Sequence, residues 1–172
     1  QHNRLRAEQI QLGFSSFQGV KRRQELRGTI NDIWVYDDFA HHPTAVAETI
    51  RALRQKHPGK RLCAVFEPRS NTSFLQINQE QLVNALAQAD EVLLAPPHRA
   101  ERIPTNERLD VQAIVHALNS QIPAQALETS AILEYLQTTA TSGDVILIMS
   151  NGKFDNLHER LLKVLESETG LA

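Results

Sequence analysis

The sequence predicts an α/β fold, a Rossmann-like and mostly parallel sheet with helices on both faces. Apolar runs rich in β-branched residues alternate along the chain with amphipathic stretches of helical spacing. The runs are too uniformly apolar for a solvated face, which indicates strands covered on both sides. The 172 residues, of which 41% are hydrophobic and 22% charged, suffice for one ordinary core.

Strands and helices are expected to alternate in order. The expected strands are residues 33–36, 62–66, 91–95 and 144–149, with a short additional one near 125–127. The expected helices are residues 44–56, 79–89, 110–118, 131–139 and 157–166. In the first helix, Val46, Ile50 and Leu53 recur at spacings of three and four residues, which places them on one face.

Residues 1–28 differ from the rest of the chain. One apolar stripe of helical spacing is followed by a linker-like stretch at 13–19 and a basic run at 21–23. Such a segment has too little apolar surface to fold alone. We therefore expect residues 1–28 to be the tail of a preceding domain plus a hinge at 15–23, and residues 29–172 to form the domain proper.

Charge and composition exclude several classes of partner. Eighteen Lys and Arg against 20 Asp and Glu give a net charge of −2, which provides no field for binding nucleic acid or anionic lipid. No apolar run approaches 18 residues and no signal peptide opens the chain, so we expect a cytoplasmic protein with no membrane partner. The single cysteine, Cys63, lies in an apolar run and is expected to be a buried thiol.

Polar side chains follow the first expected strand, where a parallel sheet gathers its ligands. Asp37, Asp38, His41 and His42 directly precede a helix that begins near Pro43. An aspartate at such a strand end can accept hydrogen bonds from both hydroxyls of a ribose. Helix capping or solvation explains the same residues, and a metal pair has less support because no third ligand lies at useful spacing.

The other strand ends carry similar groups. Arg69 can hold a carboxylate or phosphate, and Asn71 can donate a hydrogen bond to the same anion or cap a helix. Arg99 follows the third strand and fits either a ligand contact or an exposed turn. Ser150 and Asn151 follow the last strand and can bind a carboxylate at a helix start. Together these groups predict a site for a small anionic molecule.

Two familiar phosphate-binding motifs are absent from the sequence. There is no G-x-x-x-x-G-K-[ST] loop and no G-x-G-x-x-G after the first strand. No serine or cysteine nucleophile with an orienting base is recognisable. A self-contained enzyme is therefore not expected.

Four strings of residues stand out: Gly-Val-Lys-Arg-Arg-Gln-Glu at 19–25, Asp-Asp-Phe-Ala-His-His-Pro-Thr at 37–44, Phe-Glu-Pro-Arg-Ser-Asn-Thr at 66–72 and Met-Ser-Asn-Gly at 149–152. They resemble strings of the Mur ligases, the ATP-dependent amide-forming enzymes of peptidoglycan assembly. The resemblance covers the end of the central domain and the whole carboxy-terminal domain. The second string is typical of the branch that uses UDP-N-acetylmuramate as acceptor, and the last two resemble the murein peptide ligases.

The resemblance implies a role for each matching position. Arg23 matches the hinge arginine that reaches ATP, and Asp38 the carboxylate that holds the ribose. His41 and His42 match the pair that faces the junction of nucleotide and substrate. The residues that the resemblance places around the amino-bearing substrate are Arg69, Asn71, Arg99, Ser150 and Asn151. The Asp-Asn-Pro-Arg motif of the diaminopimelate-adding ligases is absent, which leaves the role of Arg99 open.

The same resemblance implies a substrate-positioning domain with no catalytic residue of its own. ATP and Mg²⁺ would be bound mainly by the central domain, of which residues 1–28 would be the remnant and hinge. The implied partners are UDP-N-acetylmuramate, the murein tripeptide L-alanyl-γ-D-glutamyl-meso-diaminopimelate, and the central and N-terminal domains of the same enzyme.

Three alternatives remain open. The chain could be a stand-alone module that binds a nucleotide or anionic metabolite, or the carboxy-terminal domain of a UDP-N-acetylmuramate L-alanine ligase. A metal-dependent hydrolase using Asp37, Asp38, His41 and His42 has the least support. All ligand-binding hypotheses require the strand ends that carry Asp38, His42, Arg69 and Ser150 to meet at one edge of the sheet.

Overall fold

The computed structural model describes residues 6–15, 20–69, 79–97 and 109–169, and it contains one six-stranded sheet. In spatial order the strands are β1 (Glu25–Ile30), β2 (Ile33–Asp38), β6 (Val145–Met149), β3 (Leu62–Phe66), β4 (Glu91–Leu94) and β5 (Ala124–Ala126). Strands β2 to β6 are parallel, and β1 pairs antiparallel with β2 at one margin. The predicted α/β class and mostly parallel sheet are confirmed.

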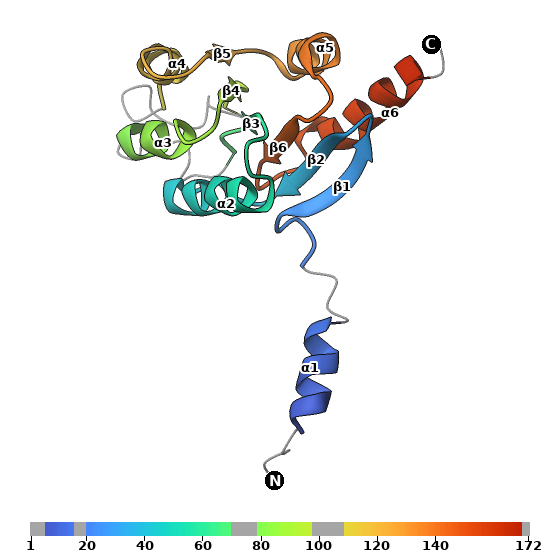
Figure 1. Ribbon diagram of the computed structural model, residues 1–172. Coiled ribbons are helices and arrows are strands. Elements are labelled where there is room, and N and C mark those ends of the chain that lie inside the picture. The colour runs from blue at the N-terminus through green and yellow to red at the C-terminus, as the bar shows by residue number, and fades with distance from the viewer. Residues whose placement is uncertain (1–5, 16–19, 70–78, 98–108, 170–172) are drawn as a thin grey trace.

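Helices cover both faces of this sheet (Figure 1). One face packs against α2 (Pro43–Lys56), α3 (Gln79–Leu86) and α4 (Val111–Leu118). The opposite face packs against α5 (Thr129–Thr139) and α6 (Leu157–Thr169), and a single 3-10 turn, η4 (Phe154–Asn156), precedes α6. Every helix in the described part of the chain is too short or too polar to span a membrane.

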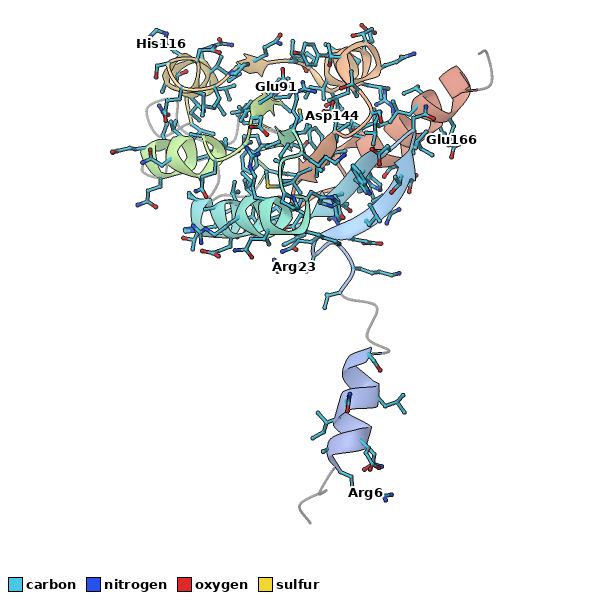
Figure 2. The ribbon with its side chains drawn as sticks, viewed as in Figure 1. Arg6, Arg23, Glu91, His116, Asp144 and Glu166 are labelled. Atoms are coloured by element: carbon cyan, nitrogen blue, oxygen red, sulfur yellow. The ribbon has the colours of Figure 1, made fainter. Side chains whose placement is uncertain are left out.

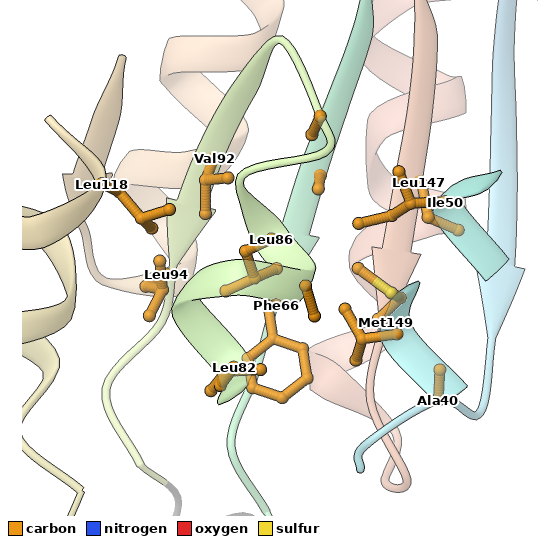
Figure 3. Close-up of a cluster of buried hydrophobic side chains, with 14 of the residues drawn as sticks. Ala40, Ile50, Phe66, Leu82, Leu86, Val92, Leu94, Leu118, Leu147 and Met149 are labelled. Carbon is orange, nitrogen blue, oxygen red and sulfur yellow. The ribbon is translucent and has the colours of Figure 1, made fainter. Parts of the chain in front are cut away.

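The two cores follow from the alternation of side chains along the buried strands. In β6, Leu147 and Met149 point to the α2–α4 face, whereas Ile146 and Ile148 point to the α5–α6 face. Figure 3 shows the first core, in which Phe66 of β3 lies among helix residues such as Leu82. Because strands β3, β4 and β6 are buried along their whole length, their sequences carry no polar alternation.

Strand β1 is the one element of the sheet that the sequence analysis did not predict. It joins β2 through a two-residue turn, Asn31 and Asp32, whose φ angles of 53° and 62° suit a tight hairpin. A β-carbon at Gly28 would lie 2.8 Å from Leu162 Cδ2, so this margin packs closely on α6. The strand runs across residue 28, and the expected domain boundary at that position stays a prediction.

Helix α1 (Ala7–Ser15) continues past the point at which the sequence suggested a linker. Figure 1 shows it standing away from the sheet and its covering helices. Its side chains include the exposed Ile10 and Leu12, the latter 69% accessible.

The amino ends of the parallel strands hold a network of charged groups around two buried carboxylates, Glu91 and Asp144. Arg61 donates to Asp144 at 2.6 Å and to Glu91 at 2.5 Å, and the Tyr135 hydroxyl donates to Glu91 at 2.5 Å. These contacts join β3, β4, β6 and α5 at the end of the sheet away from the predicted site. Cys63 is buried beside them, as predicted, and burial raises the pKa of its thiol.

Candidate functional site at the carboxyl ends of the strands

The carboxyl ends of β2, β6, β3 and β4 meet at one edge because these strands are neighbours in the sheet. Backbone hydrogen bonds continue just beyond the strands: the Ser150 amide donates to the Asp38 carbonyl at 3.1 Å, and the Glu67 amide donates to the Met149 carbonyl at 3.0 Å. Figure 2 shows Arg23 at this end of the molecule, while Glu91 and Asp144 lie at the opposite end. The polar strand ends therefore share one edge.

A row of three buried polar side chains crosses this edge on the α5–α6 side. Asp37, Ser150 and Glu67 come from neighbouring strands and are only 4%, 1% and 6% exposed. The Ser150 hydroxyl donates to Glu67 Oε2 at 2.6 Å and accepts from the Gly152 amide at 2.9 Å. The row thus ties the end of β3 to the turn that follows β6.

Two arginines flank this row. The Arg22 Nε donates to Asp37 Oδ2 at 3.1 Å, and another nitrogen of the same guanidinium donates to the Ser150 carbonyl. On the other side, Arg69 Nη1 lies 3.4 Å from each carboxylate oxygen of Glu67. Arg69 is half-buried, with 26% of its side chain exposed to solvent.

Asp38 lies on the other face of β2, where the structure gives it a local role. Its Oδ2 accepts from the Gln24 amide and its Oδ1 from the Ala40 amide, both at 2.7 Å. The side chain is 1% exposed, and this burial raises its pKa, although the two amide hydrogen bonds act in the opposite direction. In this conformation Asp38 fastens residues 20–24, which precede β1 and are called the fastened segment below, to the end of β2. The role of Asp38 toward a ribose stays a prediction.

The side chains of the basic run at 21–23 differ in their exposure to solvent. The Phe39 amide donates to the Arg22 carbonyl at 2.8 Å, and the Phe39 ring lies within 5.3 Å of the Arg22 guanidinium and 5.7 Å of the Arg23 guanidinium. Arg23 is exposed, whereas Arg22 turns inward. Arg22 and Gln24 both have left-handed φ angles, 56° and 46°, in this fastened segment.

The two histidines make local contacts. His42 is the N-cap of α2, and its Nδ1 accepts weakly from the Thr44 amide at 3.4 Å, which supports the capping alternative. His41 Nδ1 lies 2.9 Å from the Phe39 carbonyl, and the two rings meet edge to face. Within the described ranges, no group of three His, Cys, Asp or Glu side chains is arranged to hold a metal ion.

The remaining predicted residues fall into two groups. Asn151 is half-buried beside the turn after β6, and within the described part of the chain its Oδ1 has no hydrogen-bond partner. This oxygen is itself shielded from solvent. Asn71 and Arg99 lie outside the described residues.

A cavity of about 270 Å³ adjoins the row of buried polar groups on the α6 side. Its lining includes the basic side chains of Lys21, Arg22, Arg27 and Lys153, together with three carboxylates. His158 also lines the cavity, and burial lowers its pKa, which favours the neutral imidazole. The mixed charges suit a small polar ligand better than an apolar one.

The sequence analysis missed two of the groups that build this edge. Arg22 could not be distinguished from its basic neighbours, because a Lys-Arg-Arg run does not show which side chain turns inward. Glu67 stood in a quoted motif but was not assigned a role. Its position directly after a fully apolar run was the available signal, since such a residue is buried at the strand end.

The model of the family described as Mur ligase, glutamate ligase domain, matches residues 22–152. The chain belongs to the Mur ligase family. The matched segment begins at Arg22 and ends at Gly152, so it contains the whole row of buried polar groups. The resemblance predicted from the sequence strings is confirmed.

Curated Mur ligases match most of the chain. The UDP-N-acetylmuramate–L-alanyl-γ-D-glutamyl-meso-2,6-diaminoheptandioate ligase of Escherichia coli strain K12 is 42% identical over 160 residues, which are 91% of this chain and 33% of that protein. The UDP-N-acetylmuramate–L-alanine ligase of Desulforamulus reducens is 32% identical over 170 residues, 97% of this chain and 36% of that protein. The chain spans about a third of the length of these relatives.

Solved structures of Mur ligases share the fold. The murein peptide ligase of Psychrobacter arcticus 273-4 superposes with a TM-score of 0.73 at 38% identity, over 90% of this chain and 32% of that one. A domain from Haemophilus ducreyi, described as part of a ligase for the same tripeptide, gives a TM-score of 0.64 at 34% identity over 83% of this chain and 99% of its own. The six-stranded architecture is thus one that relatives of this family adopt.

Proposed function

We propose that this chain is the substrate-positioning carboxy-terminal domain of an ATP-dependent ligase that joins a murein tripeptide, L-alanyl-γ-D-glutamyl-meso-diaminopimelate, to UDP-N-acetylmuramate. The observation that carries the proposal is the carboxyl edge of the sheet, where half-buried Arg69 lies beside buried Ser150 and Glu67. The identity to the Escherichia coli tripeptide ligase, 42%, exceeds that to the Desulforamulus reducens L-alanine ligase, 32%, which favours the tripeptide.

Arg69 is the residue that we assign to a carboxylate of the tripeptide. A guanidinium offers paired donors that match a carboxylate, and a partly desolvated pair of this kind contributes more than a neutral hydrogen bond. Ser150 and Asn151 lie on the adjacent turn, and the Asn151 Oδ1 supplies an acceptor for an N–H of the substrate. Asn71 and Arg99 remain further predicted contacts from segments outside the described residues.

The nucleotide would meet this domain at the fastened segment. ATP, when bound, supplies the phosphoryl group that activates the muramate carboxylate. Arg23 fits such a contact because it is exposed and lies beside the Phe39 ring. Asp38 is buried and already accepts two backbone hydrogen bonds, so it serves the ribose only if the Gln24 or Ala40 contact opens. The described residues do not form a carboxylate cluster that fits Mg²⁺, and we assign no step to that ion.

This domain would therefore position the amine and exclude water. Bringing the amine against the activated carboxylate makes the attack effectively intramolecular, and closure against a central domain would protect the activated group from hydrolysis. We propose His41 and His42 as groups facing that junction, and the central and N-terminal domains as the partners that hold UDP-N-acetylmuramate. A cytoplasmic location suits these partners and stays part of the proposal.

The proposal is tested by Arg69→Ala in the complete ligase that carries this chain. Loss of a charged contact worth roughly 3 kcal/mol raises the KM for the tripeptide about 10²-fold, while the KM for ATP stays unchanged. Arg51→Ala is the matched control, because Arg51 is an exposed arginine of α2 that pairs with Glu48 one turn away. An unchanged tripeptide KM in Arg69→Ala would remove Arg69 from the site.

The L-alanine ligase remains a second candidate because relatives of that name match up to 97% of the chain. The two functions differ in the amino component, so L-alanine and the tripeptide are compared as substrates of the same preparation. A higher kcat/KM for L-alanine would replace the proposed function. Micromolar nucleotide binding by this chain alone, measured by calorimetry, would instead favour a stand-alone binding module.

A further inference from the structure

Glu67 is a buried carboxylate without an assigned role at the carboxyl edge. It follows β3 directly and is 6% exposed. Its Oε2 accepts a hydrogen bond of 2.6 Å from the Ser150 hydroxyl, and its backbone amide donates to the Met149 carbonyl. Burial of a charge is unfavourable unless partners compensate for it, so these contacts fix where the carboxylate lies.

Arg69 contacts the same carboxylate, but at a longer distance than a close ion pair has. Its Nη1 lies 3.4 Å from both oxygens of Glu67, longer than the roughly 2.7–2.9 Å of a close charge-assisted hydrogen bond. Glu67 therefore contacts the guanidinium through one nitrogen and sets the direction in which it points.

The turn after β6 determines the space that Arg69 occupies. A β-carbon on Gly152 would lie 2.0 Å from Arg69 Cδ, 2.1 Å from Nε and 2.5 Å from Cζ. The arginine thus passes directly over the bare backbone of Gly152. The Gly152 amide in turn donates to the Ser150 hydroxyl, whose proton goes to Glu67.

We infer that Glu67 is a positioning residue for substrate binding: through Ser150 and the turn at Gly152 it holds Arg69 in the orientation that receives a substrate carboxylate. Glu67 itself does not touch the substrate. The inference rests on the proposed function, because it assigns to Arg69 the carboxylate of the amino component. It adds Glu67 and Gly152 to the residues that determine affinity for that component.

The test is a set of double-mutant cycles in the complete ligase. The glutamine in Glu67→Gln has two orientations: in one its NH₂ faces the Arg69 guanidinium, and in the other the Ser150 hydroxyl loses its acceptor. Either orientation weakens the positioning of Arg69, so the tripeptide KM rises about tenfold. Gly152→Ala raises this KM by a similar or larger factor because the new methyl displaces Arg69. Both effects disappear when the same changes are made in an Arg69→Ala background, while the KM for ATP stays constant throughout.

Glu91→Gln is the matched control. Glu91 is 5% exposed, has an arginine partner and accepts from a hydroxyl, but it lies at the opposite end of the sheet. Its substitution lowers the melting temperature and leaves the tripeptide KM unchanged. A rise in KM for Glu91→Gln equal to that for Glu67→Gln would show a general effect of stability and overturn the inference.

The remaining outcomes separate this inference from the proposed function. If Arg69→Ala raises the tripeptide KM but Glu67→Gln and Gly152→Ala do not, or if their effects persist without Arg69, the positioning role is wrong and the proposed function stands. If Arg69→Ala leaves the KM unchanged, both fail. Should Glu67→Gln not fold, the Gly152→Ala cycle decides alone, since the backbone at Gly152 does not require a left-handed conformation.

Discussion

The two ends of the sheet both place arginines beside buried carboxylates, but the distances differ. At the amino ends, Arg61 lies 2.5 Å from Glu91 and 2.6 Å from Asp144. At the carboxyl ends, Arg69 lies 3.4 Å from Glu67. Arg61, 38% exposed, donates to two buried carboxylates and joins strands, whereas Arg69, 26% exposed, contacts Glu67 at a longer distance. We propose that the same residue types serve stability at the amino ends of the strands and substrate binding at the carboxyl ends.

The largest expected effect on stability is that of Arg61→Ala. The substitution leaves Glu91 and Asp144 buried without their cation, and we expect the free energy of unfolding to fall by about 3 kcal/mol. That is the lower end of the range for a broken buried pair, because Arg61 is itself 38% exposed. Urea unfolding of this chain measures the change in the free energy of unfolding. Arg69→Ala should lose less than about 1 kcal/mol in the same experiment, and equal losses would break the comparison.

An intermediate effect is expected for Asp38→Asn. The asparagine can accept from only one of the two amides that Asp38 now satisfies, and it turns an NH₂ toward the other. We expect the free energy of unfolding to fall by about 2 kcal/mol. Asp32→Asn is the control, since Asp32 is exposed and pairs with Lys60 only at 3.5 Å. A neutral result for Asp38→Asn would show that the fastened segment contributes no stability.

The smallest effect concerns the pH dependence of stability. Burial lowers the pKa of His158 below its ordinary value of 6.5, so the folded state binds fewer protons than the unfolded state in this window. The free energy of unfolding therefore rises as the pH increases from the lowered pKa toward 6.5. His158→Gln should reduce this slope by a measurable amount, whereas His116→Gln on the exposed surface of α4 should not. Urea unfolding of each variant at several pH values between 5 and 7.5 measures this slope.

The sequence predicted the parallel strands because burial on two faces leaves a continuous apolar run. It did not predict β1, whose residues are all half-buried or exposed and which packs closely on α6 at Gly28. The helix ends were placed within a few residues. The largest differences were at the end of α3, which stops at Leu86 rather than at residue 89, and of α6, which continues to Thr169.

The candidate site was predicted in part, for a related reason. Topology brings all carboxyl ends of parallel strands to one edge, so Asp38, Arg69 and Ser150 could be placed in one region from the sequence. The sequence could not show which of these three side chains faces solvent. Asp38 proved buried and bonded to backbone amides, and Arg22 proved to be the inward-facing member of the basic run.

The sequence by itself determined the class of fold, the family and the edge of the sheet that carries the polar groups, because these depend on periodicity and on short strings of residues. Only the tertiary structure decided that Glu67 lies between Ser150 and Arg69, and that Gly152 leaves room for the arginine. Ser150 and Gly152 are more than 80 residues from Glu67 along the chain. They meet because β6 inserts between β2 and β3, and that order is set by packing across the whole sheet.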